Sequence, residues 1–162
     1  RVVVHRRLVE FGGRGVRVRW AGQCERRWVG VIKVLETAEQ RRNKNTAMSL
    51  VMCVNNGGRA EIANAVVRIA HLVREGKINP DRITAATVSR YLDEPEMPDV
   101  DLFLRSSGEQ RTSNFLLWQS AYAEMVFLDQ LWPDFDRRDL WKAIEIYVER
   151  DRRYGGAQGP AV

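Results

Sequence analysis

Hydrophobic positions along the chain follow two spacings, one typical of strands and one typical of helices. Residues 16–20 alternate apolar and basic side chains, as expected of a strand with one covered face. Residues 26–44 place apolar side chains at helical intervals, which predicts an amphipathic helix. Residues 49–54 form a continuous apolar run, typical of a strand covered on both faces. The pair Gly57 and Gly58 then precedes a helical pattern that runs to about Glu75.

The second half of the chain shows the same two spacings in shorter runs. A short helix is predicted at residues 83–91, where a threonine stands at the N-cap position. Apolar runs at 102–104 and 125–128 have the length of buried strands, and residues 114–119 between them predict a short buried helical turn. The spacing at 137–154 predicts a closing helix that ends near a glycine pair.

This alternation of strand and helix patterns determines the predicted fold class. Strands that alternate with helices generate an α/β architecture, so the sequence predicts a mostly parallel central sheet with flanking helices. A chain of 162 residues is long enough to bury one hydrophobic core. We therefore expect residues 1–156 to form a single α/β domain and residues 157–162 to form a loose tail.

The composition of the chain favours a negatively charged partner. The formal net charge is +5, which suits a diphosphate, a nucleic acid or an anionic membrane surface. The basic residues are scattered, and no RNA-binding pattern or zinc-finger spacing occurs, so nucleic acid is not an expected partner. Cys24 and Cys53 are too few for a disulfide framework. With no signal peptide and no membrane-spanning run in the sequence, the cytoplasm is the expected location.

The candidate chemistry lies in the stretch Asp101–Asp129. Its first predicted strand ends on Arg105 and leads into a polar loop that also contains Arg111 and Ser113. Open α/β sheets bind ligands at the carboxyl ends of their strands, and guanidinium groups and hydroxyls donate hydrogen bonds to phosphate oxygens. From the residues alone, a phosphate site and an ordinary surface loop with solvated arginines fit this stretch equally well.

Three segments of the chain resemble motifs of one enzyme family. They read Arg105-Ser-Ser-Gly-Glu-Gln-Arg-Thr-Ser-Asn-Phe115, Leu131-Trp-Pro-Asp-Phe135 and Asn55-Asn-Gly-Gly-Arg-Ala-Glu-Ile62. All three are similar to segments of the cis-prenyltransferases, the undecaprenyl and related polyprenyl diphosphate synthases. The resemblance extends from about residue 16 to residue 156.

The resemblance implies a transferase that joins isopentenyl diphosphate to an allylic diphosphate such as farnesyl diphosphate. The product would be a polyprenyl diphosphate carrier lipid of the undecaprenyl or decaprenyl type, used for the cell wall. By motif position, Arg105, Arg111 and Ser113 match the residues that hold the diphosphate of isopentenyl diphosphate. Glu124 matches a carboxylate that helps to bind the cofactor Mg²⁺, a hard cation suited to carboxylate and phosphate oxygens.

The resemblance also implies a partner subunit. Arg153 and Gly155 match a carboxyl-terminal Arg-x-Gly element, which in the family reaches the substrate site of the other subunit. We therefore expect a homodimer, and we further expect peripheral contact with a membrane.

Two motifs of the family do not occur in these 162 residues. One is an Asp-Gly-Asn-x-x-Arg-Trp segment, which in the family supplies the catalytic aspartate and the cradle for the allylic diphosphate; the other is a Ser-x-Glu-Asn element. The catalytic residue is therefore unassigned, and we expect the 162 residues to hold half of an active site and to be inactive alone.

Three hypotheses remain open at the level of sequence. The first is a polyprenyl diphosphate synthase whose amino-terminal part lies outside these residues. The second is a non-catalytic subunit of a two-component cis-prenyltransferase. Such subunits usually lose the loop from Arg105 to Ser113, here called the arginine loop, which this chain retains. The third is a nucleic-acid-binding module, which only the charge favours. Product chain length and the preferred allylic substrate are not determined by these residues.

Overall fold

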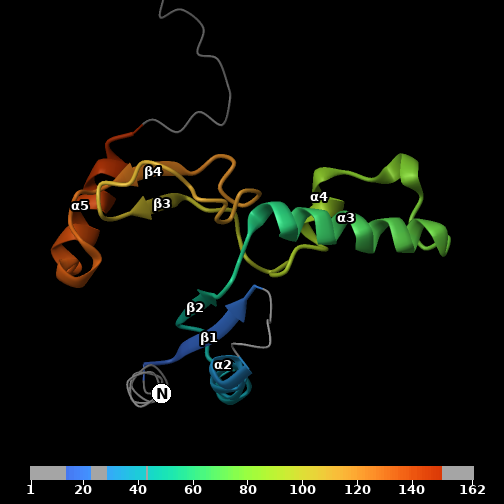
Figure 1. Ribbon diagram of the computed structural model, residues 1–162, viewed down its shortest axis with the longest axis horizontal. Helices are drawn as coiled ribbons and strands as arrows, with labels where there is room; N and C mark the ends of the chain where they lie inside the picture. The colour runs from blue at the N-terminus through green and yellow to red at the C-terminus, as the bar shows by residue number, and fades with distance from the viewer. Residues whose placement is uncertain (1–13, 23–28, 43, 151–162) are drawn as a thin grey trace, which may run out of the picture. The chain divides into compact units, whose positions relative to one another are not determined.

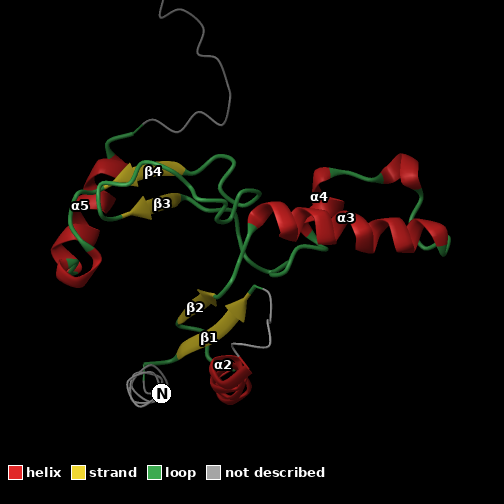
Figure 2. Ribbon diagram, viewed as in Figure 1, coloured by secondary structure: helices red, strands yellow, loops and turns green. Residues whose placement is uncertain are grey.

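The strands and helices divide between two units, Arg1–Pro95 and Glu96–Val162. The computed structural model describes residues 14–22, 29–42 and 44–150. Each unit has its own pair of parallel strands with a helix beside it (Figures 1 and 2). This arrangement confirms the predicted α/β fold class. The assignment of residues 1–156 to a single domain stays a prediction.

In the first unit, β1 (Val16–Ala21) pairs in parallel with β2 (Met48–Cys53). The helix α2 (Val29–Arg42) packs against β1 and buries Leu35 there. The predicted alternation of β1 is confirmed, because its valines are buried while its arginines keep partial exposure. The prediction that the next strand is covered on both faces is wrong. Met48 and Ser49 begin β2 exposed, and the strand ends half-buried, since α2 packs against β1.

Gly22 permits a close approach of the chain after the two strands. The amide of Val54 donates to the carbonyl oxygen of Ala21 at 2.9 Å, immediately beyond the paired residues. Gly22 has a φ of +123°, and a Cβ at this position would lie 2.0 Å from the carbonyl oxygen of Val54. A side chain therefore does not fit at this point.

Two further helices of the first unit follow β2. The helix α3 (Gly58–Arg74) follows the N-cap Gly57, and a 3₁₀ turn, η2 (Pro80–Arg82), leads to the short helix α4 (Ala85–Ser89). The predicted cap of α4 is confirmed. The Thr84 hydroxyl accepts a hydrogen bond from the amide of Thr87 at 3.4 Å, and the Thr87 hydroxyl accepts one from the amide of Thr84 at 3.1 Å.

The second unit is built on β3 (Leu102–Arg105) and β4 (Glu124–Phe127), which pair in parallel from Leu102 opposite Glu124 to Arg105 opposite Phe127. A 3₁₀ turn, η3 (Trp132–Asp134), leads to the helix α5 (Arg137–Val148), which packs on both strands. The core between them consists of Val126, Leu128 and Ala143.

Local interactions define where α5 begins and ends. Asp136 is the N-cap and forms a capping box with Asp139. Hydrogen bonds from Arg138 lower the pKa of the Asp136 carboxyl, which stays ionised as a cap. The helix ends at Val148, earlier than the predicted end at residue 154, and residues 151–162 lie outside the described part.

The helical turn predicted at residues 114–119 does not form. The backbone has positive φ angles at Ser113 (50°), Asn114 (65°) and Leu116 (45°), and the segment is a succession of turns. Left-handed conformations of this kind interrupt a right-handed helix at each residue that adopts them.

Candidate functional site

The side chain of Arg105 lies at the carboxyl end of β3 and contacts the loop that follows this strand. Its Nη1 donates to the Ser113 hydroxyl oxygen at 2.8 Å and to the carbonyl oxygen of Arg111 at 2.5 Å. The structure therefore brings the residues of the sequence-predicted phosphate site together in one loop. These two hydrogen bonds fix the direction of the guanidinium. Its other N–H groups can donate hydrogen bonds to an anion.

Arg111 is the more exposed of the two arginines. Its guanidinium forms an ion pair with the carboxylate of Glu109 in the same loop. The Arg111 side chain is 62% exposed and the Glu109 side chain 40%. An exposed pair of this kind is weak, so Arg111 remains accessible to an anion from solvent.

The beginning of the loop is fixed to the segment that follows β4. The amide of Ser107 donates to the carbonyl oxygen of Gln130 at 2.9 Å, and the amide of Gly108 donates to that of Leu128 at 3.0 Å. Ser107 and Gly108 both have positive φ angles, of 71° and 69°. These two bonds hold the loop at the carboxyl edge of the β3–β4 pair.

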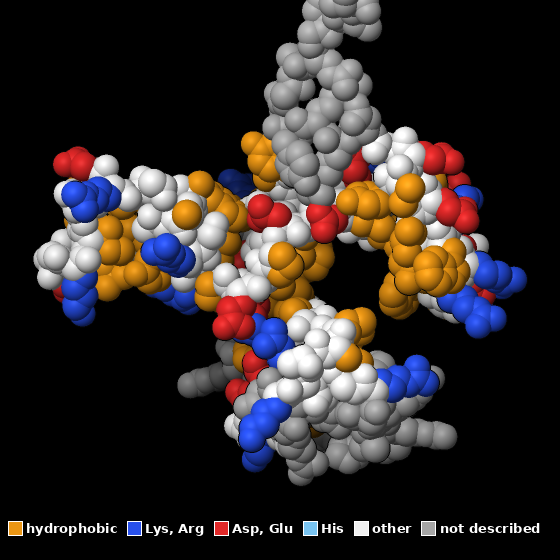
Figure 3. Space-filling model, turned by 180° about the vertical axis from the view of Figure 1, so that it is seen from behind, with side chains coloured by type: hydrophobic (Ala, Val, Ile, Leu, Met, Phe, Trp, Pro, Cys, Tyr) orange, Lys and Arg blue, Asp and Glu red, His pale blue; other side chains and the backbone are white. Residues whose placement is uncertain are grey.

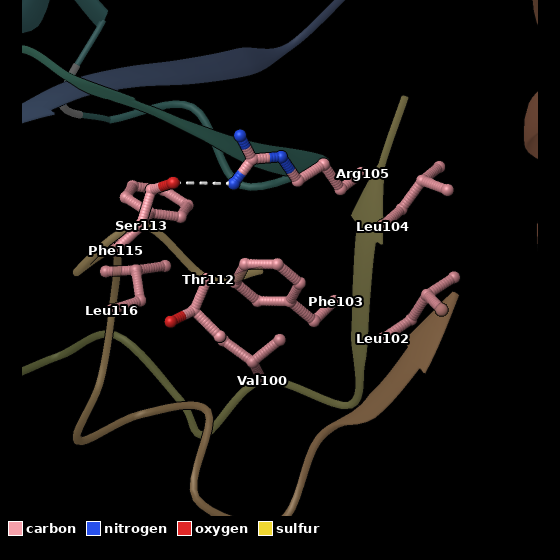
Figure 4. Close-up of a pocket in the computed structure, with 9 residues that line it drawn as sticks. All are labelled: Val100, Leu102, Phe103, Leu104, Arg105, Thr112, Ser113, Phe115 and Leu116. Atoms are coloured by element: carbon pink, nitrogen blue, oxygen red, sulfur yellow. Dashed lines mark hydrogen bonds between the residues drawn. The ribbon is translucent and has the colours of Figure 1, made fainter. Parts of the chain in front are cut away.

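An apolar cavity of about 470 Å³ adjoins the arginine end of the loop (Figure 4). Phe103 and Phe115 meet edge to face in its wall, with ring centroids 6.2 Å apart. Arg105 and Ser113 contribute polar groups to the same wall. The volume falls in the range of small-molecule sites, roughly 300–1,000 Å³. The remaining lining residues are Val100, Leu102, Leu104, Thr112 and Leu116.

Glu124 lies at the opposite end of the strand pair from Arg105. It begins β4 opposite Leu102, three residues before the level of Arg105, which corresponds to about 10 Å along a strand. Its carboxylate pairs with Arg150, whose Nη1 lies 3.1 Å from Glu124 Oε2 and 2.8 Å from the carbonyl oxygen of Met125. Within one chain, the structure does not bring Glu124 to the arginine loop.

The other two sequence-predicted site residues, Arg153 and Gly155, lie outside the described residues.

Comparison with known proteins identifies the family. A family model described as putative undecaprenyl diphosphate synthase matches residues 1–155. The chain belongs to this family. The fold agrees as well: the crystal structure of lavandulyl diphosphate synthase from Lavandula x intermedia, in complex with dimethylallyl diphosphate, is similar with a TM-score of 0.84. That similarity holds at 34% sequence identity and covers 87% of this chain and 61% of the other.

Curated members of the family are similar at higher identity. A trans,polycis-polyprenyl diphosphate synthase of Thermobifida fusca, described as specific for (2Z,6E)-farnesyl diphosphate, is 61% identical over 158 residues, which are 98% of this chain and 56% of that protein. A decaprenyl diphosphate synthase of Mycobacterium tuberculosis is 54% identical over 157 residues, 97% of this chain and 53% of that protein. The chain thus spans about half the length of these relatives.

The described part of the chain contains no cluster of three or more His, Cys, Asp or Glu side chains able to hold a metal ion. Mg²⁺ does not require such a cluster, because it commonly keeps waters and substrate phosphates and takes only one or two carboxylates. A single carboxylate such as Glu124 fits that donor set.

Two buried carboxylates in the first unit were not singled out from the sequence. Glu61 in the first turn of α3 is 2% exposed, and its Oε1 accepts a hydrogen bond from the amide of Asp93 at 3.2 Å. Glu94 is 8% exposed, with Arg19 Nη2 2.7 Å from its Oε2. Burial raises the pKa of the nearby Cys53 thiol, and the charges of Glu61 and Glu94 raise it further, so this thiol is protonated at neutral pH and is no nucleophile. The sequence signal for Glu61 was its place in the motif Asn55–Ile62, shortly after the glycine pair.

Large apolar side chains are exposed on the second unit. Trp132 and Trp141 are 72% and 61% exposed, and Trp132 stacks on Phe135 with ring centroids 5.5 Å apart. Hydrophobic side chains are visible on the molecular surface among basic ones (Figure 3). None of the described helices is long and apolar enough to cross a membrane. The further exposed apolar residues of this unit include Tyr122, Leu131, Leu140 and Val148.

Proposed function

We propose that the protein performs cis-prenyl chain elongation, condensing isopentenyl diphosphate with an allylic diphosphate to build a polyprenyl diphosphate. Membership of the undecaprenyl diphosphate synthase family supports this reaction. The similar proteins of Thermobifida fusca and Mycobacterium tuberculosis carry the names of polyprenyl and decaprenyl diphosphate synthases. A carrier lipid of this length class is therefore the proposed product.

One observation carries the proposal: the arginine loop adjoins the apolar cavity. Arg105 and Ser113 contact each other at the cavity wall, and Arg111 lies in the same loop. A ligand with a diphosphate at one end and a hydrocarbon at the other matches this pairing of cationic and apolar groups. We propose that Arg105, Arg111 and Ser113 bind the diphosphate of isopentenyl diphosphate.

The proposed reaction breaks one bond and forms another. The C–O bond of the allylic diphosphate breaks, diphosphate leaves with the electron pair, and an allylic cation remains. The double bond of isopentenyl diphosphate attacks this cation to form a new C–C bond, and loss of a proton completes the new cis double bond. The arginine loop contributes by holding isopentenyl diphosphate in position, because positioning and charge stabilisation carry most of such chemistry.

Magnesium is the proposed cofactor, and Glu124 is the carboxylate proposed to help hold it. When bound, the ion neutralises charge on a diphosphate and so favours its departure. Arg150 keeps the Glu124 carboxylate in a fixed place at the start of β4. Because this place is distant from Arg105 along the strands, we do not assign Glu124 to the arginine loop of its own chain.

We further propose that the working unit is a homodimer in the cytoplasm with peripheral membrane contact. Exposed tryptophans on the second unit support an apolar contact with a second copy. The carboxyl-terminal Arg153 and Gly155 are proposed to reach the site of the partner subunit. A product with a long hydrocarbon chain supports the membrane contact.

The test uses the protein encoded by the complete gene. It is incubated with radiolabelled isopentenyl diphosphate, farnesyl diphosphate and magnesium, and the products are separated by chain length. We expect label in polyprenyl diphosphates longer than farnesyl diphosphate, and loss of most of this label in the variant Arg111→Ala. Absence of any elongated product with farnesyl, geranyl and dimethylallyl diphosphate as primers would exclude the proposed reaction.

A further inference from the structure

A carboxylate stands inside the loop that is proposed to bind a diphosphate. Glu109 lies between Arg105 and Arg111, and it forms an ion pair with Arg111. Its carboxylate occupies the Arg111 guanidinium and so competes with a diphosphate for the same donors. Glu109 therefore has a role other than direct contact with the diphosphate.

The backbone around Glu109 is held in place on both sides. The amide of Gly108 donates to the carbonyl oxygen of Leu128, and the carbonyl oxygen of Arg111 accepts from Arg105 Nη1. These contacts keep Glu109 within reach of Arg111. The Arg111 side chain, by contrast, is 62% exposed and is free to exchange one anionic partner for another.

We propose that Glu109 is an internal counter-ion of Arg111, which a diphosphate must displace in order to bind. The inference rests on the proposed function and adds a residue that sets how tightly the site holds its anion. A diphosphate carries more charge than a carboxylate and contacts more than one donor, so it displaces Glu109 when present. When the diphosphate leaves, the carboxylate returns to Arg111 and lowers the affinity for rebinding.

The expected effect is moderate because the ion pair is exposed. Exposed pairs contribute up to about 1 kcal/mol, and a contribution of about 0.7–1 kcal/mol corresponds to roughly a three- to fivefold change in affinity. The variant Glu109→Gln keeps the size and polarity of the side chain and removes its charge. We therefore expect it to bind inorganic diphosphate about three to five times more tightly than the unsubstituted protein.

The matched control is Glu145→Gln, which removes the same charge from an exposed position on α5, outside the loop. Each protein is titrated with inorganic diphosphate by calorimetry in magnesium-free buffer, at low and at high salt. Glu109→Gln is expected to bind more tightly than both the unsubstituted protein and the control, with a smaller difference at high salt because exposed charges are screened. Circular dichroism verifies that each variant is folded.

A double-mutant cycle tests whether Glu109 acts through Arg111. In the background Arg111→Ala, the change Glu109→Gln is expected to have no larger effect than Glu145→Gln. A gain in affinity that persists without Arg111 would assign Glu109 a general repulsion and overturn the inference.

Two other outcomes overturn it as well. Equal or weaker binding by Glu109→Gln, with normal binding by the unsubstituted protein, refutes the counter-ion role and leaves the proposed function intact. No binding of diphosphate by any form refutes the proposed function and this inference together.

Discussion

Arg111 differs from Arg105 in how the loop holds it. Arg105 is fixed by Ser113 and by the carbonyl oxygen of Arg111, whereas Arg111 extends into solvent beside Glu109. A fixed guanidinium orients a ligand, and an exposed one recruits it and adjusts to it. Losing either arginine removes charge-assisted hydrogen bonds to the proposed diphosphate.

Replacement of Arg111 by alanine is therefore expected to weaken binding of isopentenyl diphosphate. Charge-assisted bonds contribute about 1.5–3 kcal/mol each, so the dissociation constant should rise roughly 10- to 100-fold. Calorimetric titration of the complete protein measures the change. The control Arg137→Ala removes an exposed arginine from α5 and should leave affinity within about twofold, as surface charges outside a site usually do. Equal affinities for both variants would contradict the assignment.

The sequence predicted which residues form the candidate site but not which of them form ion pairs with one another. The motif resemblance led to Arg105, Arg111 and Ser113, and the structure brings them into one loop. The pairing of Glu109 with Arg111 had no signal in the sequence. Hydrophobic periodicity describes regular elements, while this pairing depends on irregular backbone such as the positive φ at Ser107.

Individual elements were predicted best where a local interaction determines them. Thr84 was expected to cap α4 and does so, because a threonine hydroxyl at an N-cap bonds an amide within the same turn. The prediction of a helical turn at 114–119 was wrong because Ser113, Asn114 and Leu116 adopt left-handed backbone conformations. The composition of the segment does not reveal these conformations. Burial of β2 was overestimated because an apolar run does not specify which strand a helix will cover.

The close approach at Gly22 leads to a prediction about the β1–β2 pair. In the variant Gly22→Ala, the new Cβ would lie 2.0 Å from the carbonyl oxygen of Val54, so the backbone must shift and the bond from Val54 to Ala21 must weaken. We expect a loss of stability of at least about 2–3 kcal/mol, from steric overlap added to left-handed strain.

Gly76 provides the matched control for this change. Its φ is +70°, and a Cβ there would meet nothing within 4 Å, so Gly76→Ala adds backbone strain of about 1–2 kcal/mol without a clash. Urea unfolding of both variants measures the difference. Equal midpoints would show that Gly22→Ala costs no more than backbone strain, so that the overlap with the Val54 carbonyl oxygen adds nothing.

For the whole molecule, the sequence predicted the α/β class with parallel strands, which the structure and the family similarity confirm. Strands separated by long connections favour this class, because parallel pairing needs a crossover of a dozen or more residues; the connection between β3 and β4 is long enough although no helix forms in it. The division into units at Pro95 was not predicted. Such a division depends on contacts between residues distant in sequence, which hydrophobic periodicity does not describe.

The proposed homodimer leads to a test by subunit mixing. Under the proposal, Arg153 of one subunit completes the site that contains Arg111 of the other. Mixing two inactive variants of the complete protein, Arg153→Ala and Arg111→Ala, then gives mixed dimers with one intact site, as two-fold pairing requires. We expect partial recovery of activity, up to about half per mixed dimer. Mass spectrometry confirms the mixed dimers, and no recovery in their presence would exclude action across the interface.

The attachment of the loop after β3 to the segment after β4 has a consequence for backbone exchange with solvent. The amides of Ser107 and Gly108 donate to Gln130 and Leu128, although both residues are exposed. Deuterium should therefore replace their amide protons slowly, at a rate set by opening of the β3–β4 edge and not by surface accessibility. The exchange rates of these two amides would therefore report how often that edge opens, with or without substrate present.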